Sequence, residues 1–320
     1  MKKEIRCYLC DSRWWRSLGC HPDFLNSRIL QCFFCGHIWT HPYPSPNELK
    51  QLYQSDYYRR RNVQPDDAYI RFMDQRAAAQ LRFIFSTVRI AASARVLDIG
   101  CAAGSFLKNL ADHTPDLIGY EPDSDMATMA KRRLPSSALV VNEEWPPAHS
   151  SSSLFDLVSI SHVLEHIAHA SEFLSGLLQA TRPEGYLFLE VPHETSQTVQ
   201  EQIYARHRGL MHLHFFSERS LCRLVEKAGG RVVAAAQFGP DIRKFSLVPA
   251  RDGRFRRRLF WHSRVVAKRF LNRIGIDFRL ETEIDLASHL CRCTPRYGIW
   301  LRMIIRQAPL SEQLHMSVIG

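Results

Sequence analysis

The chain lacks long apolar runs, internal repeats and segments of biased composition. No window of about 18 uninterrupted apolar residues occurs in its 320 residues, so we expect no transmembrane helix. The basic start Met1-Lys2-Lys3 is not followed by an apolar stretch, so we expect no secretion signal and a cytoplasmic protein. This length accommodates one sizeable catalytic domain with smaller appendages.

An excess of charge is also lacking over most of the chain. Residues 1–240 contain 26 Lys and Arg against 25 Asp and Glu, whereas residues 241–320 contain 16 against 7. The formal net charge of +10 therefore belongs to the C-terminal quarter, and it predicts a local anionic contact. Within that quarter, residues 254–276 have apolar positions at helical spacing and an Arg-rich opposite face. Such a helix can contact an anionic membrane surface, bind a phosphate-bearing substrate or cover the protein's own core.

Four of the nine cysteines form two closely spaced pairs, Cys7-x-x-Cys10 and Cys32-x-x-Cys35. In a chain without a secretion signal, this spacing predicts metal binding rather than disulfides. Two such turns brought together give a tetrahedral all-sulfur site, which suits zinc. Free thiols and bound iron are the alternatives. Because about 45 residues bury little core unaided, we expect the zinc to be structural.

A Gly-rich turn follows a short apolar run at residues 95–104, which read Arg-Val-Leu-Asp-Ile-Gly-Cys-Ala-Ala-Gly. The run contains Asp98, the turn contains Gly100 and Gly104, and a helical pattern continues from Ser105. Strand, turn and helix in this order open a doubly wound sheet, whose ligands bind at the carboxyl ends of the strands. The Gly-x-Gly-x-x-Gly fingerprint of dinucleotide-binding proteins is lacking. Asp98 can instead accept hydrogen bonds from a cationic amino group.

A second strand ends at Glu121, 23 positions after Asp98, which is close to the spacing of a β-α-β unit. An acid at this place can accept hydrogen bonds from both hydroxyls of a ribose. Further strands are predicted at 138–141, 155–161, 186–191, 231–238 and 297–306, with a turn at 182–185 and helices at 123–133, 171–181 and 218–228. The short connections predict an α/β fold with a Rossmann-like, doubly wound and mostly parallel sheet.

Taken together, these segments resemble the successive motifs of class I S-adenosylmethionine-dependent methyltransferases. The segments that carry the resemblance are 96–104, 120–122, 155–167 and 182–192. Residues 32–39, 44–49 and 52–58 are similar to the zinc-ribbon subgroup, which includes deoxysugar C-methyltransferases and enzymes of surface-glycan and natural-product pathways. The resemblance implies S-adenosylmethionine as cofactor and a seven-stranded sheet whose last two strands are antiparallel.

The resemblance also implies roles for individual residues around the cofactor. Asp98, Gly100 and Gly104 would line its methionine part, Glu121 would hold the ribose, Asn142 or Glu143 would lie near adenine, and Ser161 and His162 near the sulfonium. The enzyme must place a nucleophile in line with the methyl carbon and the sulfur, so proximity and orientation supply much of the rate. A general base is needed only if the nucleophile starts protonated.

Three histidines are candidates for that base. His162 forms a His-x-x-Glu-His pattern with Glu165 and His166, which also occurs in certain zinc proteases, but its place after the fourth strand favours the methyltransferase reading. Residues 212–217 resemble the His-Glu-His-x-x-Tyr-Phe-Ser segment of sugar C-methyltransferases, whose second His is a candidate base. We therefore predict that His214 faces the substrate, with His212 as a further candidate; a packed or capping role for His214 is the alternative. Leu replaces the Glu of that segment, which leaves O- and N-methylation open beside C-methylation.

We accordingly divide the chain into five parts. They are a zinc ribbon (1–45), a helical linker or lid (46–90), a methyltransferase core (91–240), a basic insertion (241–294), and a final strand with a tail (295–320). The leading prediction is methyl transfer from S-adenosylmethionine to a small-molecule acceptor, such as a sugar, a glycan or a natural-product intermediate. An RNA methyltransferase that uses the ribbon and the basic segment is the alternative, and a non-catalytic binding protein is the second alternative. The oligomeric state stays open.

Overall fold

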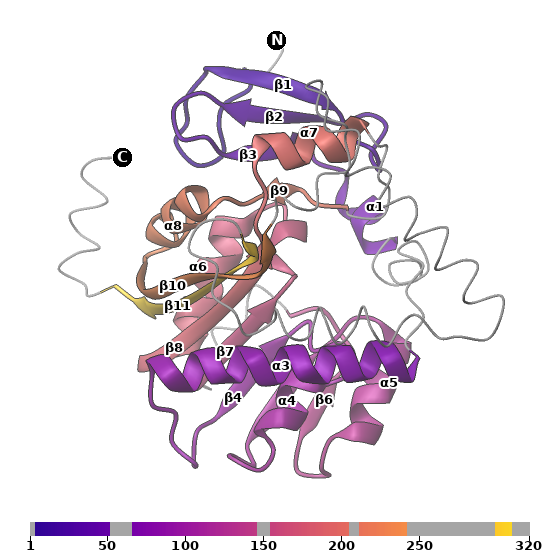
Figure 1. Cartoon of the computed structure of the whole chain (residues 1–320), viewed down its shortest axis with the longest axis vertical. Helices are drawn as coiled ribbons and strands as arrows, with labels where there is room; N and C mark the ends of the chain where they lie inside the picture. Colours follow the sequence, from indigo (N-terminus) through magenta and orange to yellow (C-terminus); the bar gives the residue numbers. More distant parts are fainter. Residues whose placement is uncertain (1–3, 52–65, 146–153, 205–210, 242–297, 309–320) are drawn as a thin grey trace.

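The computed structural model describes residues 4–51, 66–145, 154–204, 211–241 and 298–308. They form a large α/β sheet with helices on both faces and a smaller antiparallel sheet near the N-terminus (Figure 1). Among these residues, none of the helices is long and apolar enough to cross a bilayer. The predicted basic helix at 254–276 and most of the predicted insertion at 241–294 lie outside the described residues.

The large sheet has seven strands in the order β10-β11-β8-β7-β4-β5-β6. Their bounds are β4 Val96–Ile99, β5 Leu117–Tyr120, β6 Leu139–Val141, β7 Phe155–Ser161, β8 Thr181–Pro192, β10 Gly230–Asp241 and β11 Gly298–Gln307. The five strands from β8 to β6 pair in parallel, whereas β11 is antiparallel to both β8 and β10. The prediction of a mostly parallel, seven-stranded, doubly wound sheet with a final antiparallel pair is thus confirmed.

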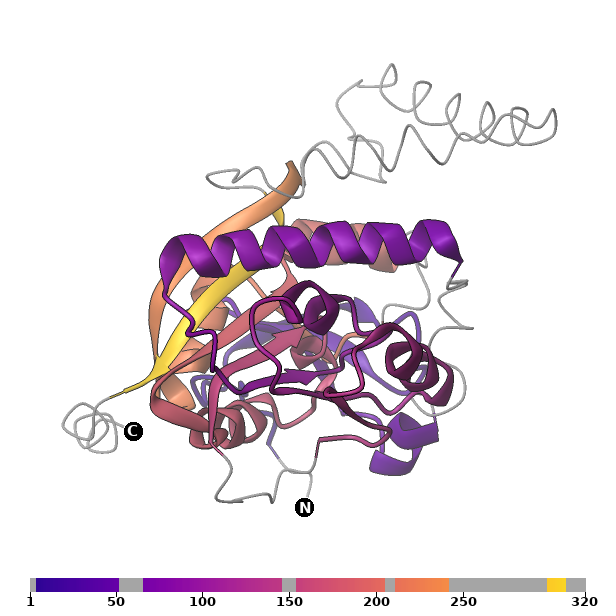
Figure 2. The ribbon, with the colours of Figure 1, turned by 90° about the horizontal axis from the view of Figure 1, so that it is seen from below.

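The helices follow the strands along the chain. Their bounds are α1 Pro46–Gln51, α3 Asp67–Thr87, α4 Ser105–Leu110, α5 Ser124–Arg133, the short 3-10 helix η2 Leu164–His166, α6 Ala170–Ala180, α7 Ser196–Tyr204 and α8 Glu218–Lys227. The helices predicted after the second and fourth strands and before the sixth are confirmed to within a residue at each end. Figure 2 shows α3 lying across the sheet as a single long helix.

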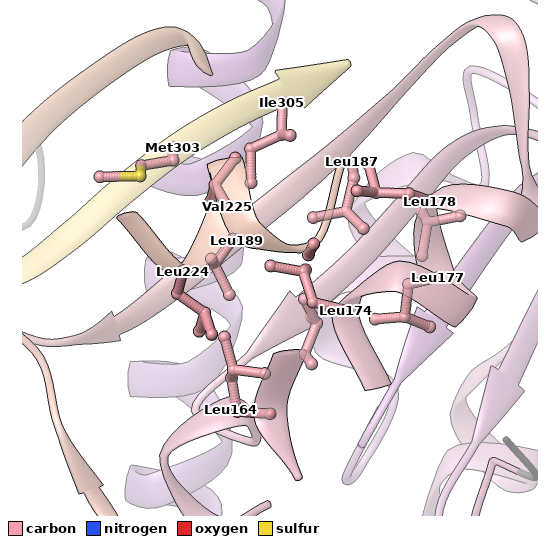
Figure 3. Close-up of a cluster of buried hydrophobic side chains, with 14 of the residues drawn as sticks. Leu164, Leu174, Leu177, Leu178, Leu187, Leu189, Leu224, Val225, Met303 and Ile305 are labelled. Atoms are coloured by element: carbon pink, nitrogen blue, oxygen red, sulfur yellow. The ribbon is translucent and has the colours of Figure 1, made fainter. Parts of the chain in front are cut away.

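Apolar side chains point alternately to the two faces of the central strands, which explains why helices cover both faces of the sheet. Leu187, Leu189 and Val191 of β8 point to one face, where they pack against α6 and α8 (Figure 3). Phe188 points to the other face, where it packs with residues of α3 and α4. Side chains alternate with a period of two along a strand, so an uninterrupted apolar run is buried on both sides.

One predicted break in the sheet is corrected by the structure. The turn expected at 182–185 does not precede its strand but lies inside β8, because Thr181 pairs with Phe155 and Tyr186 pairs with Leu157. The additional residues therefore bulge out of register while the strand continues. A Cβ at Gly185 would lie 2.9 Å from two backbone carbonyl oxygens of β7, so the bulge requires a glycine there.

The N-terminal module is joined to the core through backbone pairing. Its strands β1 Trp15–Cys20, β2 Arg28–Cys32 and β3 Ile38–His41 form an antiparallel sheet whose fourth strand is β9, His214–Phe215, of the core. Trp39 of β3 pairs with His214, and the nearby Thr40 amide donates to the Leu213 carbonyl at 2.8 Å. The module is thus fixed to the segment that contains two of the predicted catalytic histidines.

Candidate cofactor and active site

A cavity of about 990 Å³ opens at the carboxyl ends of β4, β5 and β7. Side chains at the ends of parallel strands meet at one edge of a sheet, which is where doubly wound folds bind ligands. Six of the predicted site residues line it: Asp98, Gly100, Glu121, Glu143, Ser161 and His162. Gly104, Asn142, His212 and His214 are not among the described residues of its lining.

Asp98 and Glu121 are buried acids on neighbouring strands, 4% and 5% exposed. Asp98 lies within β4, which pairs in parallel with β5, and Glu121 directly follows β5. Both oxygens of Glu121 accept backbone hydrogen bonds, from the Ala102 amide at 2.8 Å and the Asp123 amide at 2.9 Å. These two hydrogen bonds fix the orientation of the Glu121 carboxylate at the cavity. Burial raises the pKa of Asp98 to about 7 and that of Glu121 to about 7.

The turn after β4 brings backbone, rather than side chains, to the cavity. Gly100 has a φ of +69°, and a Cβ added there would lie 2.5 Å from Cγ2 of Val163. Ala102 also has a positive φ, of 47°. Gly104 has a φ of +77° at the N-cap of α4, where a Cβ would meet Leu134 of the α5 C-cap at 3.2 Å. Gly100 therefore leaves room for the side chain of Val163 in the cavity wall, whereas Gly104 permits close helix packing.

The segment after β6 contains both residues predicted near adenine, and the two have different contacts. Glu143 lines the cavity, together with Trp145. Asn142 instead donates from Nδ2 to the backbone carbonyl of Glu121 at 2.9 Å and to that of Pro122 at 3.1 Å. Asn142 thus fixes the loop that carries the second acid, and Glu143 is the one of the pair that faces the ligand space.

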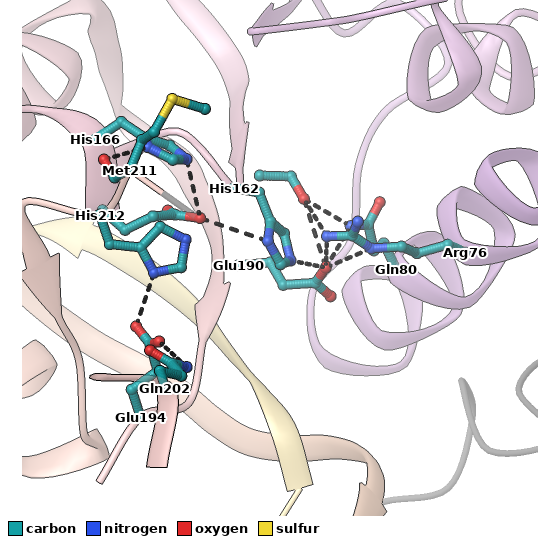
Figure 4. Close-up of polar contacts among 11 residues, drawn as sticks. Arg76, Gln80, His162, His166, Glu190, Glu194, Gln202, Met211 and His212 are labelled. Carbon is teal, nitrogen blue, oxygen red and sulfur yellow. Dashed lines mark hydrogen bonds and ion pairs between the residues drawn. The ribbon is translucent and has the colours of Figure 1, made fainter. Parts of the chain in front are cut away.

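His162 is held in an uncommon backbone conformation at the end of β7. Its φ is 55°, in the left-handed region that few residues other than glycine adopt. The ring lies between two buried carboxylates, with Nδ1 3.4 Å from Oε1 of Glu165 and Nε2 3.5 Å from Oε1 of Glu190 (Figure 4). Strained residues of this kind cluster at ligand sites, where surrounding structure holds them in place.

Glu190 is the centre of a buried ionic network in the wall of the cavity, which the sequence analysis did not predict. It accepts hydrogen bonds from Nε of Arg76 at 2.8 Å and Nε2 of Gln80 at 2.9 Å, and it pairs with Arg302. Ser161 accepts from the same Arg76 at 3.1 Å. Burial favours the neutral acid, but the charges of Arg302 and Arg76 hold the pKa of Glu190 well below its usual range.

A signal for this network is present in the sequence. Glu190 interrupts the apolar run 186–191, and Arg302 interrupts the apolar run 299–305. The two residues are direct partners in the antiparallel β8–β11 register, on the face that α3 covers. A buried charge requires a partner of opposite sign, so two such interruptions predict pairing between their strands.

His214 lies behind the cavity wall and is fully buried. Its Nε2 is 3.1 Å from the Ala168 carbonyl, and its Nδ1 is 3.1 Å from Nε2 of His37. A carbonyl only accepts, so the proton of the neutral ring belongs on Nε2. Burial lowers the pKa of His214 to about 4. Tyr43 lines the cavity and brings its hydroxyl 3.3 Å from His214 Nε2, so this tyrosine links the ring to the cavity.

The four paired cysteines converge in the N-terminal module. Their sulfur atoms all lie within 4.8 Å of one another, with 3.4 Å between Cys7 and Cys35 and 3.6 Å between Cys10 and Cys32. Three of the four are buried. Four thiol sulfurs at this separation form a donor set of the kind that holds a tetrahedral zinc ion, so the residues fit the predicted metal.

The fold and the place of the cavity agree with a class I methyltransferase, and comparison with known proteins shows the family. The sequence model of a family described as "Methyltransferase domain" matches residues 69–235, more than half of the chain. The chain therefore belongs to this methyltransferase family, whose members use S-adenosylmethionine. The prediction of an S-adenosylmethionine-dependent methyltransferase is confirmed at this level.

Individual relatives are similar over only part of their length. A trans-aconitate 2-methyltransferase of Rhodopseudomonas palustris is 25% identical over 135 residues, which are 41% of this chain and 51% of the relative. The C-methyltransferase NovU of Streptomyces niveus is 30% identical over 167 residues, 49% of this chain and 38% of the relative. The chain thus spans about half, or less, of these relatives.

A solved structure supports the fold alone. The complex of the Haloferax volcanii Trm112 methyltransferase activator with a methyltransferase matches with a TM-score of 0.50 and 12% identity. The match covers 76% of this chain and 94% of that chain.

Proposed function

We propose that the protein transfers a methyl group from S-adenosylmethionine to a small-molecule acceptor, such as a sugar, a glycan or a natural-product intermediate. One observation carries the proposal: two buried acids, Asp98 and Glu121, stand at the ends of adjacent strands in a single cavity large enough for two ligands. When bound, S-adenosylmethionine supplies a methyl group activated by its positively charged sulfur.

We propose separate roles for individual residues that line the cavity. Asp98 accepts hydrogen bonds from the amino group of the methionine part, and the two oxygens of Glu121 accept from the ribose hydroxyls. Glu143, which lines the cavity, is proposed to lie on the adenine side. His162, between its two carboxylates, takes the proton of an acceptor hydroxyl or amine. We propose that His214 acts through Tyr43 as a positioning residue.

The N-terminal module supports the small-molecule acceptor. Tyr43, Pro44 and Leu49 belong to the module and to the helix after it, and they line the same cavity. We propose that a zinc ion on the four cysteines fixes this wall, as in the zinc-ribbon subgroup that the sequence resembles. The relatives whose names state an acceptor act on compounds such as trans-aconitate and demethylmenaquinone, which are small molecules.

The test is methyl transfer from isotopically labelled S-adenosylmethionine, offered with nucleotide-linked sugars, with small natural-product hydroxyls and amines, and with total RNA. We expect label in a small-molecule acceptor and formation of S-adenosylhomocysteine. His162→Gln is expected to lower turnover at least about 100-fold while leaving cofactor affinity within about 3-fold. Label only in RNA, with affinity that falls steeply with salt, would instead establish the rival acceptor.

A further inference from the structure

Glu165, His166 and His212 form a second cluster of metal-binding side chains, beside the cavity and separate from the cysteines. One ligand atom from each lies within 4.8 Å of the other two. All three residues are buried, at 1%, 5% and 5% exposure. Glu165 and His166 belong to η2, which follows β7, whereas His212 precedes β9 and lies far away in the sequence.

The backbone holds these two segments together. The Leu213 amide donates to the Glu165 carbonyl at 2.7 Å. Met211 has a φ of 55°, which is uncommon for a bulky residue, and its amide donates to Asp23 at 3.0 Å. The His212 carbonyl accepts from His21 Nε2 at 3.0 Å. The cluster is therefore built on fixed backbone rather than on freely rotating side chains.

The two imidazole rings are oriented in the way that metal-binding histidines are. Nδ1 of His166 donates to the Met211 carbonyl at 3.1 Å, and Nδ1 of His212 donates to the Glu194 carboxylate at 3.0 Å (Figure 4). Glu194 is itself held by Gln202 at 3.0 Å. These acceptors place the proton of each neutral ring on Nδ1, so each ring presents a lone pair at Nε2. Histidine ligands typically have such a carbonyl or carboxylate partner on the other ring nitrogen.

We propose that Glu165, His166 and His212 bind a divalent transition-metal ion. Two imidazole nitrogens and one carboxylate are a donor set for zinc, iron(II), cobalt(II) or manganese(II), and they differ from the all-oxygen sets of calcium and magnesium. Three protein ligands leave a coordination position open. His166 is one of the cavity-lining residues, so a ligand in the cavity would reach the ion from that side.

The test is metal stoichiometry of the full-length protein, stripped with a chelator and reloaded with cobalt(II). Cobalt on thiolates gives an intense charge-transfer absorption, whereas cobalt on imidazole and carboxylate does not. Mass-spectrometric metal analysis is therefore expected to find about two cobalt ions per chain, of which about one accounts for the thiolate absorption. His212→Gln and Glu165→Gln are each expected to lose about one ion and to keep the full thiolate absorption.

The controls separate this site from the cysteines and from general damage. Cys32→Ser removes one of the four thiolates and is expected to reduce the thiolate absorption strongly, while the cobalt ion without thiolate ligands is retained. His113→Gln, which changes a histidine bonded to the Ile90 carbonyl outside the cluster, is expected to retain both. A wild-type protein that binds only about one ion, with full thiolate absorption, would overturn the proposal. So would a folded His212→Gln variant that still binds about two.

Discussion

Lowering the pH from about 8 to about 6 is expected to weaken the binding of S-adenosylmethionine, because two buried carboxylates of the cavity must be ionised to hold it. Burial raises the pKa of Asp98 to about 7 and that of Glu121 to about 7 in the ligand-free protein. Both acids are therefore largely protonated at the lower pH. A protonated Asp98 has lost the charge that attracts the cofactor's amino group.

The size of this loss in affinity depends on how many protons the two acids must release before the cofactor binds. One carboxylate with a pKa of about 7 raises the dissociation constant about 10-fold over this pH range, and two raise it about 100-fold. Titration calorimetry of the wild type at both pH values is expected to show a dissociation constant about 100-fold higher at the lower pH. Asp98→Asn, which leaves Glu121 in place, is expected to bind more weakly at the higher pH and to show only the about 10-fold dependence. An affinity of the wild type that does not change between the two pH values would refute the assignment.

The same raised pKa values have the opposite effect on the stability of the ligand-free protein. The folded pKa values of Asp98 and Glu121 lie above their ordinary values of 3.8 and 4.5, so the folded state binds more protons than the unfolded state between about pH 4 and 7. The ligand-free protein therefore loses stability as the pH rises through this range. Cofactor affinity increases over the same range, so the two trends are distinguishable in a single series of thermal scans with and without ligand.

Three substitutions test other parts of the structure. Glu190→Gln leaves buried arginines without their counter-charge and is expected to lower the free energy of unfolding in urea by about 3–5 kcal/mol. Its control is Glu184→Gln, which removes an exposed ion pair between β8 and β11 and should leave the free energy of unfolding unchanged. Gly100→Ala is expected to abolish cofactor binding, since its Cβ would lie 2.5 Å from a valine side chain; Gly229→Ala, where no described atom lies within 4 Å, should retain it although both glycines have positive φ. Cys35→Ser should lose the zinc and make the N-terminal module sensitive to protease, and an unchanged digestion pattern would contradict the structural role.

The parts of the fold that depend on local pattern were predictable. The strand predicted at 155–161 is found at those residues, because a short apolar run between polar turns admits few alternatives. Asp98, Gly100 and Glu121 reach one cavity because each lies at or after the end of a parallel strand. The convergence of the cysteines likewise follows from two tight turns with fixed spacing.

The parts that depend on register between distant segments were not predictable in the same way. The pairing of Glu190 with Arg302 requires the β8–β11 register, and its third partner Arg76 comes from a helix more than 100 residues earlier in the sequence. The segment around His214 was recognised by its pattern. Its position behind Tyr43 follows from the pairing of β3 with β9, and the pattern contains no information about that pairing.

The most direct test of the central claim is a crystal structure of the protein with S-adenosylhomocysteine, the product that the cofactor leaves behind. We expect the ligand in the cavity, with its amino group beside Asp98, both ribose hydroxyls on Glu121, and its sulfur facing His162. A ligand bound elsewhere, or a cavity that remains without it at saturating concentration, would contradict the assignment of this cavity as the cofactor site.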